Sequence, residues 1–493
     1  MRITNTMMVN TTMRNINRSK TSLSDAENMM ATEKKITRPS DDPIIAIRAL
    51  SLRSSLSEID MYLNNNIKEA KSWMENTEGA LDNMDGTLSD IYHYCTQGAS
   101  DQFDGESRSA IIEVISRYKE LLYSECNVDY AGRYCFTGYR TNSAFTFVDS
   151  DIPQDKKYSI TQEFSFSDMD TKKVMKNAVD VNSISDIAAA DTPETQSVNR
   201  IRLAYSGCAS TGNGNLVIDG TDVATEAVTY SQFQEKLADG TFDSESGKAY
   251  YVYDTGELML TGDLYDTIKN ADKVSFEYEK DGFTTGDPRP EMYFECKDIT
   301  DAANPVEYKK EDNPDDQMIS YNINFGQMLQ VNTLGRDTIS YNVGRDIDDM
   351  CASLKSLQDA EDKLARLKEM QNNDSYSDAE KKSIETMIAA AQKEADYELD
   401  NMKSLFSREM GRVKGYQQTV DLQLADLGAR SNRLTLTESR LREQKTTFTE
   451  LKSSNEDGEL EEIVVNYTSA KSLYQAALSA ASTCVKQSLL DYI

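Results

Sequence analysis

Residues 52–95 read LRSSLSEIDMYLNNNIKEAKSWMENTEGALDNMDGTLSDIYHYC, and apolar or small side chains recur in them every three or four positions. The recurring positions are Leu52, Leu56, Ile59, Leu63, Ile67, Ala70, Met74, Thr77, Leu81, Met84, Leu88, Ile91 and Cys95. Alternating steps of three and four residues are typical of a coiled-coil seam. The step from Leu63 to Ile67 is an extra step of four, which is a stutter that locally unwinds such a seam. The stretch therefore predicts a long helix packed along one face.

Two further helical segments follow the same spacing. Residues 107–124 form one apolar face, and residues 413–451 keep steps of three and four over nearly forty positions. Residues 351–406 also favour helix, with a loop expected around 371–377 and a helix cap at Ser377 or Asp378. Long helical stripes near both ends of one chain predict an antiparallel helical bundle.

The eight prolines separate these helical regions from the middle of the chain. Residues 44–152 and 315–493 contain no proline, whereas six prolines lie between Pro153 and Pro314. Short β-type runs in the middle alternate with turns, at 216–218, 250–253, 258–260 and 274–278. Residues 149–316 hold 35 acidic and 16 basic residues, which is -19 of the formal net charge of -30. The middle is therefore expected to be a solvated, acidic, β-rich domain.

Together these patterns predict a mainly α fold with an inserted β-rich domain. The expected boundaries are 1–44 and 456–493 for terminal helices, 45–148 and 320–455 for a helical bundle, and 149–319 for an outer domain. The long N- and C-terminal helices are expected to pair as an antiparallel coiled-coil bundle.

Charge and composition exclude several classes of protein. A surface this acidic repels phosphate backbones and anionic lipid, so we expect no nucleic acid as partner. One histidine and seven widely spaced cysteines without a CxxC pair argue against histidine-based catalysis, a metal site or any cofactor. No apolar run is long enough for a membrane span, and residues 1–20 lack the apolar core of a secretory signal.

Both ends of the chain have weak apolar faces. Val9, Met13, Ile16, Leu23, Ala26 and Met30 trace one face near the start, and small residues such as Ala477 and Ala481 line another near the end. Helices of this kind are marginally stable until partners bury them. They are either frayed ends of an ordinary bundle or elements that assemble with other subunits.

Motifs at both ends resemble one family. The start MRIT, the segment RPSDDP at 38–43, and the end SLYQAALSAASTCVKQSLLDYI at 472–493 resemble the flagellin superfamily. GRYCFTG at 132–138 with TNSAF at 141–145, and GARSNRL at 428–434, resemble other parts of its helical domain. Asp41-Asp42-Pro43-Ile44 and SLLDY at 488–492 are closer to the subunits that join hook and filament than to the filament subunit. The acidic middle has no counterpart in this resemblance.

The resemblance implies a function and a set of partners. The chain is expected to be a structural, non-enzymatic part of the bacterial flagellum, an adaptor ring between hook and filament, with a flagellin-type filament subunit as the alternative. Expected partners are further copies of the chain, a neighbouring hook-associated protein, flagellin and an export chaperone. Export through the flagellar type III channel, which needs no cleaved signal, would place the protein outside the cell. The terminal segments are expected to be disordered in the monomer and to form coaxial helices on assembly.

The expected assembly residues lie at both ends. Ser40 or Asp41 is the expected cap of the helix that begins near Pro43, with Asp41 and Asp42 favoured by its dipole. This turn is expected to act as the joint between the terminal helix and the bundle. The expected contacts between the ends involve Met13, Ile16, Leu23, Tyr474, Ala477, Ala481, Leu489 and Leu490.

Two other kinds of function fit the sequence less well. An enzyme in the middle domain would need a carboxylate-lined cleft, and no aromatic-rich signature of one is present. A generic coiled-coil adhesin or secretion-tip protein would not need the ordered terminal motifs.

Overall fold

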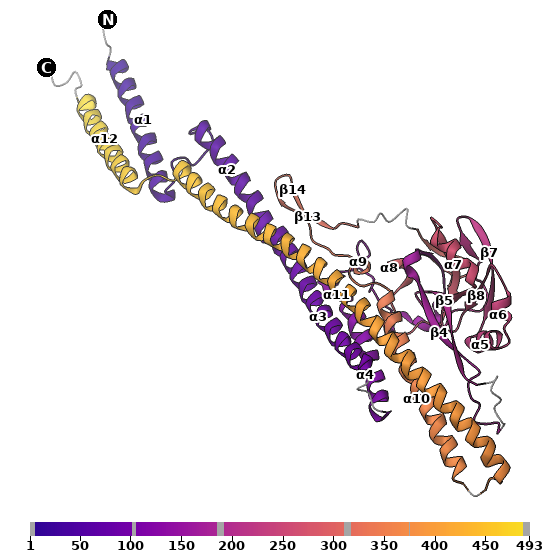
Figure 1. The fold of residues 1–493 in the computed structure, drawn as a ribbon. Coiled ribbons are helices and arrows are strands. Elements are labelled where there is room, and N and C mark those ends of the chain that lie inside the picture. Colours follow the sequence, from indigo (N-terminus) through magenta and orange to yellow (C-terminus); the bar gives the residue numbers. More distant parts are fainter. Residues whose placement is uncertain (1–4, 101–104, 185–191, 310–316, 374, 487–493) are drawn as a thin grey trace, which may run out of the picture. The chain divides into compact units, whose positions relative to one another are not determined.

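The computed structural model describes residues 5–100, 105–184, 192–309, 317–373 and 375–486 (Figure 1). The chain falls into two compact units, which we describe separately. The first unit comprises residues 1–70, 321–329 and 432–493, and the second comprises 71–320 and 330–431.

Helices account for most of the described chain, and the longest has 79 residues. They are α1 (Asn5–Thr32), α2 (Pro43–Met61), α3 (Ile67–Ala99), α4 (Gly105–Glu125), α5 (Tyr230–Ala238), α6 (Thr241–Ser244), α7 (Gly262–Lys269), α8 (Pro290–Tyr293), α9 (Gly335–Thr338), α10 (Asn342–Gln371), α11 (Asp378–Glu456) and α12 (Leu460–Lys486). All four long helical segments expected from the sequence are present.

The predicted apolar stripe on residues 52–95 is the buried face of α2 and α3. From Ile67 to Cys95 every stripe residue is buried, whereas Leu52, Leu56 and Leu63 are half-buried. A π-helical turn, Tyr62–Asn66, lies where the extra step of four falls. Two successive four-residue steps rotate an α-helical face by about 80°, and a wider π turn takes back part of that rotation. The stutter is therefore absorbed inside one continuous run of helix.

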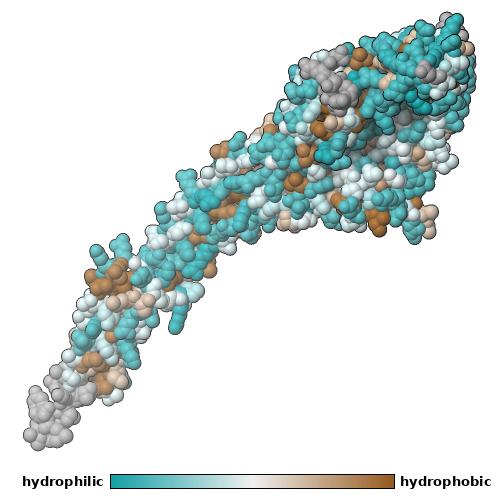
Figure 2. All heavy atoms as spheres, turned by 90° about the horizontal axis from the view of Figure 1, so that it is seen from below, coloured by the Kyte–Doolittle hydropathy of each residue, from teal (hydrophilic) through white to brown (hydrophobic). Residues whose placement is uncertain are grey.

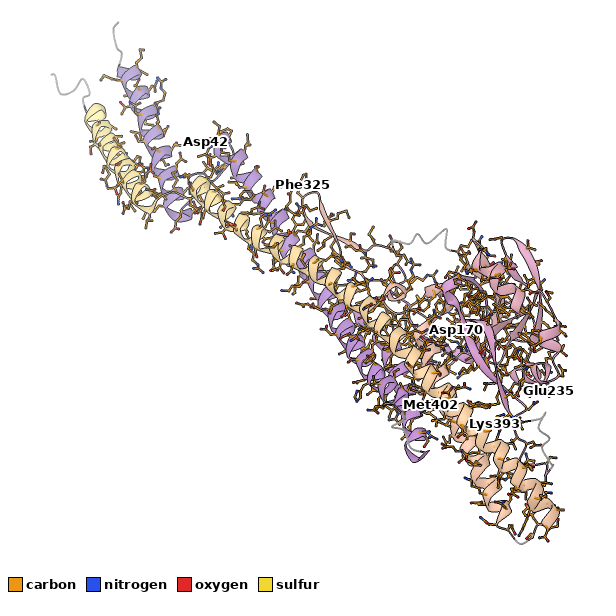
Figure 3. The ribbon with its side chains drawn as sticks, in the orientation of Figure 1. Asp42, Asp170, Glu235, Phe325, Lys393 and Met402 are labelled. Atoms are coloured by element: carbon orange, nitrogen blue, oxygen red, sulfur yellow. The ribbon has the colours of Figure 1, made fainter. Side chains whose placement is uncertain are left out.

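A β-hairpin contacts this π turn in the first unit. It consists of β13 (Ser320–Asn324) and β14 (Gln327–Gln330). Asn66 Nδ2 donates to the Asn322 carbonyl at 2.7 Å, and Tyr321 Oη donates to Glu69 Oε2 at 3.1 Å. Phe325 stands at the tip of the hairpin with 85% of its surface exposed (Figure 3).

The second unit contains a helical bundle built on the predicted C-terminal stripe. Val413, Val420 and Leu427 are buried at seven-residue intervals on α11, and Leu434 and Leu441 continue the interval in the first unit. The predicted break near 371–377 separates α10 from α11. Ser377 caps α11, since its Oγ accepts from the Glu380 amide at 3.3 Å while Glu380 Oε2 accepts from the Ser377 amide at 2.8 Å.

The β-rich middle is a ten-stranded sheet within the second unit. Its order is β12-β11-β3-β10-β6-β7-β8-β9-β5-β4, and only β7 and β8 are parallel among the registered pairs. The strands are β3 (Tyr158–Phe164), β4 (Met169–Lys176), β5 (Glu194–Arg202), β6 (Leu216–Ile218), β7 (Thr221–Val228), β8 (Lys248–Val252), β9 (Glu257–Leu260), β10 (Val274–Lys280), β11 (Glu295–Asp298) and β12 (Val306–Tyr308), with β1 (Asp129–Tyr130) and β2 (Arg133–Tyr134) in a separate hairpin. The four strands expected from the sequence are β6, β8, β9 and β10.

A network of buried ion pairs connects this sheet with α10 and α11. Arg200 on β5 is 2% exposed and donates through Nε to Asp170 Oδ1 on β4 and through Nη2 to Asp349 Oδ2 on α10, both at 2.6 Å. It also pairs with Glu257 on β9. Burial alone would raise the pKa of Asp170, but the positive charge of Arg200 lowers it to about 2. Asp170 lies between the sheet and the helices in Figure 3.

The helical side of the network centres on Asp346 of α10. Its carboxylate accepts from Arg202 Nη2 at 2.6 Å, Arg412 Nη1 at 2.8 Å and Tyr416 Oη at 2.7 Å. Glu409 of α11 lies beside it and is fully buried, with Oε1 contacting Arg412 at 3.2 Å. Because Arg200, Arg202 and Arg412 each pair with carboxylates on other elements, the network fixes sheet and helices against each other.

Candidate assembly interface

Helices α1 and α12 form an antiparallel pair in the first unit. Ala26 of α1 and Ile463 and Ala470 of α12 are buried, and each helix contributes half-buried residues to the same face. The half-buried residues include Ile16, Leu23, Tyr467, Tyr474, Ala477 and Ala481. Because small residues such as Ala470, Ala477 and Ala481 line this face of α12, the contact buries few large side chains.

Large apolar side chains remain exposed on both helices of the pair. Met13 is 57% exposed on α1, and Val465 and Leu473 are 62% and 64% exposed on α12. Figure 2 shows such apolar side chains among polar ones on the described part of the terminal helices. These exposed apolar side chains make the outward faces of α1 and α12 a candidate interaction surface.

The terminal residues expected to take part in assembly are placed unequally. Ile16, Leu23, Tyr474, Ala477 and Ala481 lie on the face that α1 and α12 share. Met13 is exposed, because the half-buried positions on this part of α1 are Thr12, Ile16, Ser19 and Leu23. The expected contact of Met13 with α12 stays a prediction, and its exposed surface leaves it available to another subunit. Leu489 and Leu490 lie outside the described residues.

The connections that follow α1 and precede α12 are hydrogen-bonded to each other. The Lys35 amide donates to the Glu456 carbonyl at 2.7 Å, and the Gly458 amide donates to the Glu33 carbonyl at 3.0 Å. Lys34 forms an ion pair with Asp457. Residues 33–35 and 456–458, more than 400 residues apart in sequence, are therefore in contact, and we call this contact the joint.

Glu456 anchors this joint to α2. Its side chain is nearly fully buried and accepts two hydrogen bonds from Arg53, at 2.8 Å from Nε and 2.7 Å from Nη2. The paired hydrogen bonds with Arg53 lower the pKa of Glu456. Asn455 adds a bond from Nδ2 to the Ile45 carbonyl at 3.0 Å. Sequence reasoning missed Lys34, Arg53, Glu456 and Asp457, since their partners are distant in the chain.

The segment RPSDDP forms the turn into α2, with its two aspartates in different roles. Asp42 is the N-cap, because its side chain accepts from the amides of Ile44 at 2.9 Å and Ile45 at 3.2 Å, and Pro43 occupies the first helical turn (Figure 3). Asp41 instead accepts from the Arg38 amide at 2.8 Å, and this bond helps to lower its pKa. The expected cap at Ser40 or Asp41 is therefore wrong by one or two residues, and the first-turn position of Pro43 is confirmed.

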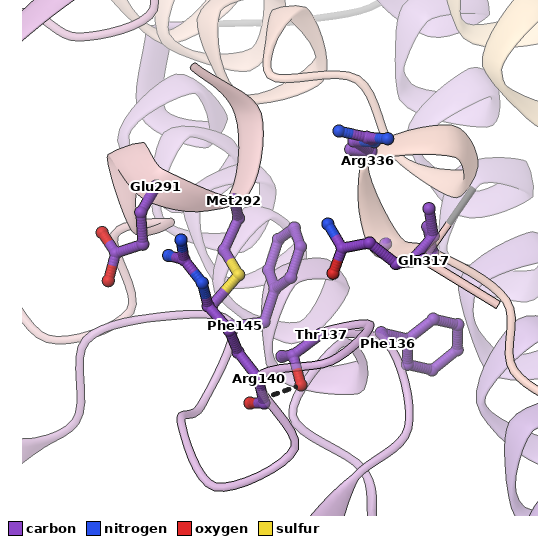
Figure 4. A pocket seen from close by; sticks show the side chains of 10 residues that line it. Phe136, Thr137, Arg140, Phe145, Glu291, Met292, Gln317 and Arg336 are labelled. Atoms are coloured by element: carbon purple, nitrogen blue, oxygen red, sulfur yellow. Dashed lines mark hydrogen bonds between the residues drawn. The ribbon is translucent and has the colours of Figure 1, made fainter. Parts of the chain in front are cut away.

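The motif at 132–145 forms a compact loop in the second unit. The Gly335 amide donates to the Phe136 carbonyl at 2.8 Å, and Thr137 Oγ1 donates to the Arg140 carbonyl at 2.9 Å (Figure 4). Arg140, Glu291 and Gln317 surround a cavity of about 10 Å³, which is roughly the space of one water molecule. This space is too small for an organic substrate.

No group of three or more candidate metal ligands occurs among residues 5–100, 105–184, 192–309, 317–373 and 375–486. No helix in this part of the chain combines the length and the apolar character needed to cross a bilayer.

Comparison with known proteins identifies the two ends of the chain. Residues 3–141 match the family model for the bacterial flagellin N-terminal helical region, and residues 410–493 match the one for the bacterial flagellin C-terminal helical region. The matched segments contain α1–α4 and most of α11 and α12, which include the joint described above. The ten-stranded sheet lies outside both.

Individual relatives cover a smaller part of the chain. It is 27% identical over 146 residues to proteins named flagellar hook-associated protein 3 from Escherichia coli and from Salmonella typhimurium. The match covers 29% of this chain and 45% of each relative, so the chain spans less than half the length of these relatives.

One solved structure is that of flagellar hook-associated protein 3 from Legionella pneumophila. It is 11% identical, covers 81% of this chain and 96% of its own, and has a TM-score of 0.31. A TM-score this low does not establish a shared overall arrangement. Residues 3–141 and 410–493 are thus similar to the helical regions of bacterial flagellins, which confirms the resemblance that the terminal motifs predict.

Proposed function

We propose that this protein is a structural subunit of the bacterial flagellum that joins the hook to the filament by self-assembly through its terminal helices. The observation that carries the proposal is the α1–α12 pair, whose outward faces expose large apolar side chains such as Met13 and Leu473. The flagellin-type helical regions and the names of the curated relatives support the flagellar setting.

The joint supports the proposal that different segments of the chain have different roles. Glu456 and Arg53 couple the turn after α1 to the start of the bundle, so a force on the terminal pair reaches α2 and α11 directly. We propose residues 1–44 and 456–493 as the assembly elements, 45–148 and 320–455 as the bundle, and 149–319 as the outward domain. Disorder of the terminal segments in the monomer stays a prediction.

The proposed partners follow from this role. Further copies of the chain would complete the terminal faces, and a neighbouring hook-associated protein and flagellin would contact the two ends of the resulting layer. An export chaperone would cover the terminal faces before secretion. We propose no catalytic activity and no cofactor.

The proposal is tested by adding purified protein to isolated hooks and imaging the hook ends by electron microscopy. Leu473→Asp places a charge on the exposed face of α12, so it should abolish the added layer while the circular dichroism spectrum stays unchanged. Val306→Asp is the matched control, because Val306 is 52% exposed on strand β12, far in sequence from the terminal helices. Equal layers from both variants would refute the proposed assembly face.

A filament subunit is the second candidate, because the matched helical regions are those of flagellins. The same experiment separates the two. A junction subunit adds a layer of limited length and stops, whereas a filament subunit continues to elongate as long as protein is supplied.

A further inference from the structure

A second cavity, of about 300 Å³, lies in the second unit between the sheet, α4 and α10. Its lining includes two buried cationic side chains, Lys280 at the end of β10 and Arg345 in the first turn of α10. They are 7% and 5% exposed. Three tyrosines, Tyr123, Tyr205 and Tyr341, also line it. The volume is at the lower end of those typical for small-ligand sites.

Neither cation has an acidic partner within ion-pair distance among the described residues. Lys280 Nζ donates to the Gly207 carbonyl at 3.0 Å and lies 5.4 Å from the centre of the Phe283 ring. Arg345 Nη2 donates to the Thr255 carbonyl at 2.6 Å. Carbonyl groups and one aromatic face compensate only part of the cost of burying two positive charges.

The acidic residues nearby are already engaged. Asp348 accepts both of its hydrogen bonds from Lys119, at 2.7 and 2.8 Å. Asp287 accepts from the amide and hydroxyl of Thr284, at 2.8 and 3.0 Å. Asp349, one turn beyond Arg345, is held by Arg200 and Arg202. The cavity lining thus contains three cations and two anions, in a chain whose net charge is -30.

The position of Arg345 is unfavourable in a second way. It occupies the first turn of a 30-residue helix, where the helix dipole disfavours a positive charge. A buried cation at a helix N-terminus with no carboxylate beside it lowers the stability of the fold. Residues placed so unfavourably for stability are found mainly at functional sites. An anion in the cavity would offset both costs.

We propose that this cavity binds a small oxyanion, a phosphate or a carboxylate, between Lys280 and Arg345. The tyrosine rings would contact the body that carries the anion. The bound anion would stabilise the contact between the sheet and α10, because Lys280 belongs to the sheet and Arg345 to the helix.

The proposal is tested on the full chain by thermal unfolding in increasing inorganic phosphate, with sodium chloride adjusted to hold ionic strength constant. A parallel series uses acetate, which distinguishes a phosphate site from a carboxylate site. We expect the melting temperature to rise and saturate with at least one of the two anions, whereas an unchanged melting temperature with both overturns the proposal.

Two variants locate the effect. Lys280→Met and Arg345→Met should each reduce the anion-dependent rise at least threefold. Lys269→Met is the matched control, because Lys269 is an exposed lysine on α7 of the same domain. If Arg345→Met does not fold, Lys280→Met carries the test. A rise that survives Lys280→Met, or that Lys269→Met abolishes equally, would refute the assignment.

Discussion

At the scale of single residues, the buried charges carry the clearest physical signals. Glu409 has no exposed surface, and burial together with the negative charge of Asp346 raises its pKa to about 7. Only Oε1 is engaged by arginines, since Oε2 has no partner among the described residues. The ionised form of this carboxylate is therefore poorly compensated.

This placement predicts how stability changes with pH. Between the ordinary glutamate pKa of 4.5 and a pKa of about 7, the folded protein keeps a proton on Glu409 that the unfolded chain has lost. The contribution of Glu409 to stability therefore falls as pH rises through this window. Glu409→Gln should raise the free energy of unfolding at pH 8 by roughly 1–3 kcal/mol and change it little near pH 5.

Thermal unfolding at pH 5 and pH 8 checks this prediction. Glu443→Gln, which changes an exposed glutamate on the same helix, is the control and should leave both values unchanged. Destabilisation of Glu409→Gln at pH 8 would show that its ion pairs outweigh its burial.

A second prediction concerns the joint at Glu456. Arg53→Met removes two charge-assisted hydrogen bonds from the buried carboxylate of Glu456 and leaves it the longer ion pair with Lys34, at 3.7 Å, so the joint should lose about 1–3 kcal/mol. Exchange of the Lys35 and Gly458 amides, whose bonds close the joint, should accelerate accordingly in hydrogen-exchange experiments.

The control for the joint is Arg442→Met on α11. Arg442 forms an exposed pair with Glu438 one turn away, and such pairs contribute little. Equal exchange rates in Arg53→Met and Arg442→Met would contradict the anchoring role of Glu456.

At the scale of elements, periodicity predicted the helices well and the sheet poorly. The seams on 52–95 and 413–451 depend on local spacing, which the sequence displays directly. The sequence did not indicate strands β3, β4, β5 and β7. Their pairing partners are distant in sequence, and the polar residues on their exposed faces are also typical of loops. The joint was only partly predicted. RPSDDP indicates the start of a helix, but nothing in this segment indicates that Glu456 binds that helix.

The π turn at Tyr62–Asn66 gives a prediction at this scale. A single π turn adds one residue to a helix without rotating the face that follows. Deleting Asn65 should therefore convert the turn into α-helix and keep the stripe from Ile67 onward in place, with a change in melting temperature of only a few degrees.

Deleting Asn76 is the matched comparison, because Asn76 is also an exposed asparagine but lies inside regular α3. That deletion rotates the face beyond it by about 100° and should unfold the bundle or lower its melting temperature by more than 10 °C. Similar losses for both deletions would show that the π turn itself is required.

At the scale of the whole molecule, the charge and the assembly faces belong to different parts of the chain. The acidic residues are concentrated in the middle, whereas the flagellin-type regions at the ends expose apolar side chains. The net negative charge is therefore mainly a property of the sheet domain and keeps that domain solvated. The proposed partners are determined by the terminal helices.

The central claim is that this chain joins the hook to the filament, and electron microscopy of cells lacking the protein tests it most directly. We predict hooks without filaments, together with flagellin released as monomer into the medium, and recovery of filaments when the full chain is restored but not the Leu473→Asp variant. Full-length filaments on the hooks of cells that lack the protein would contradict the account.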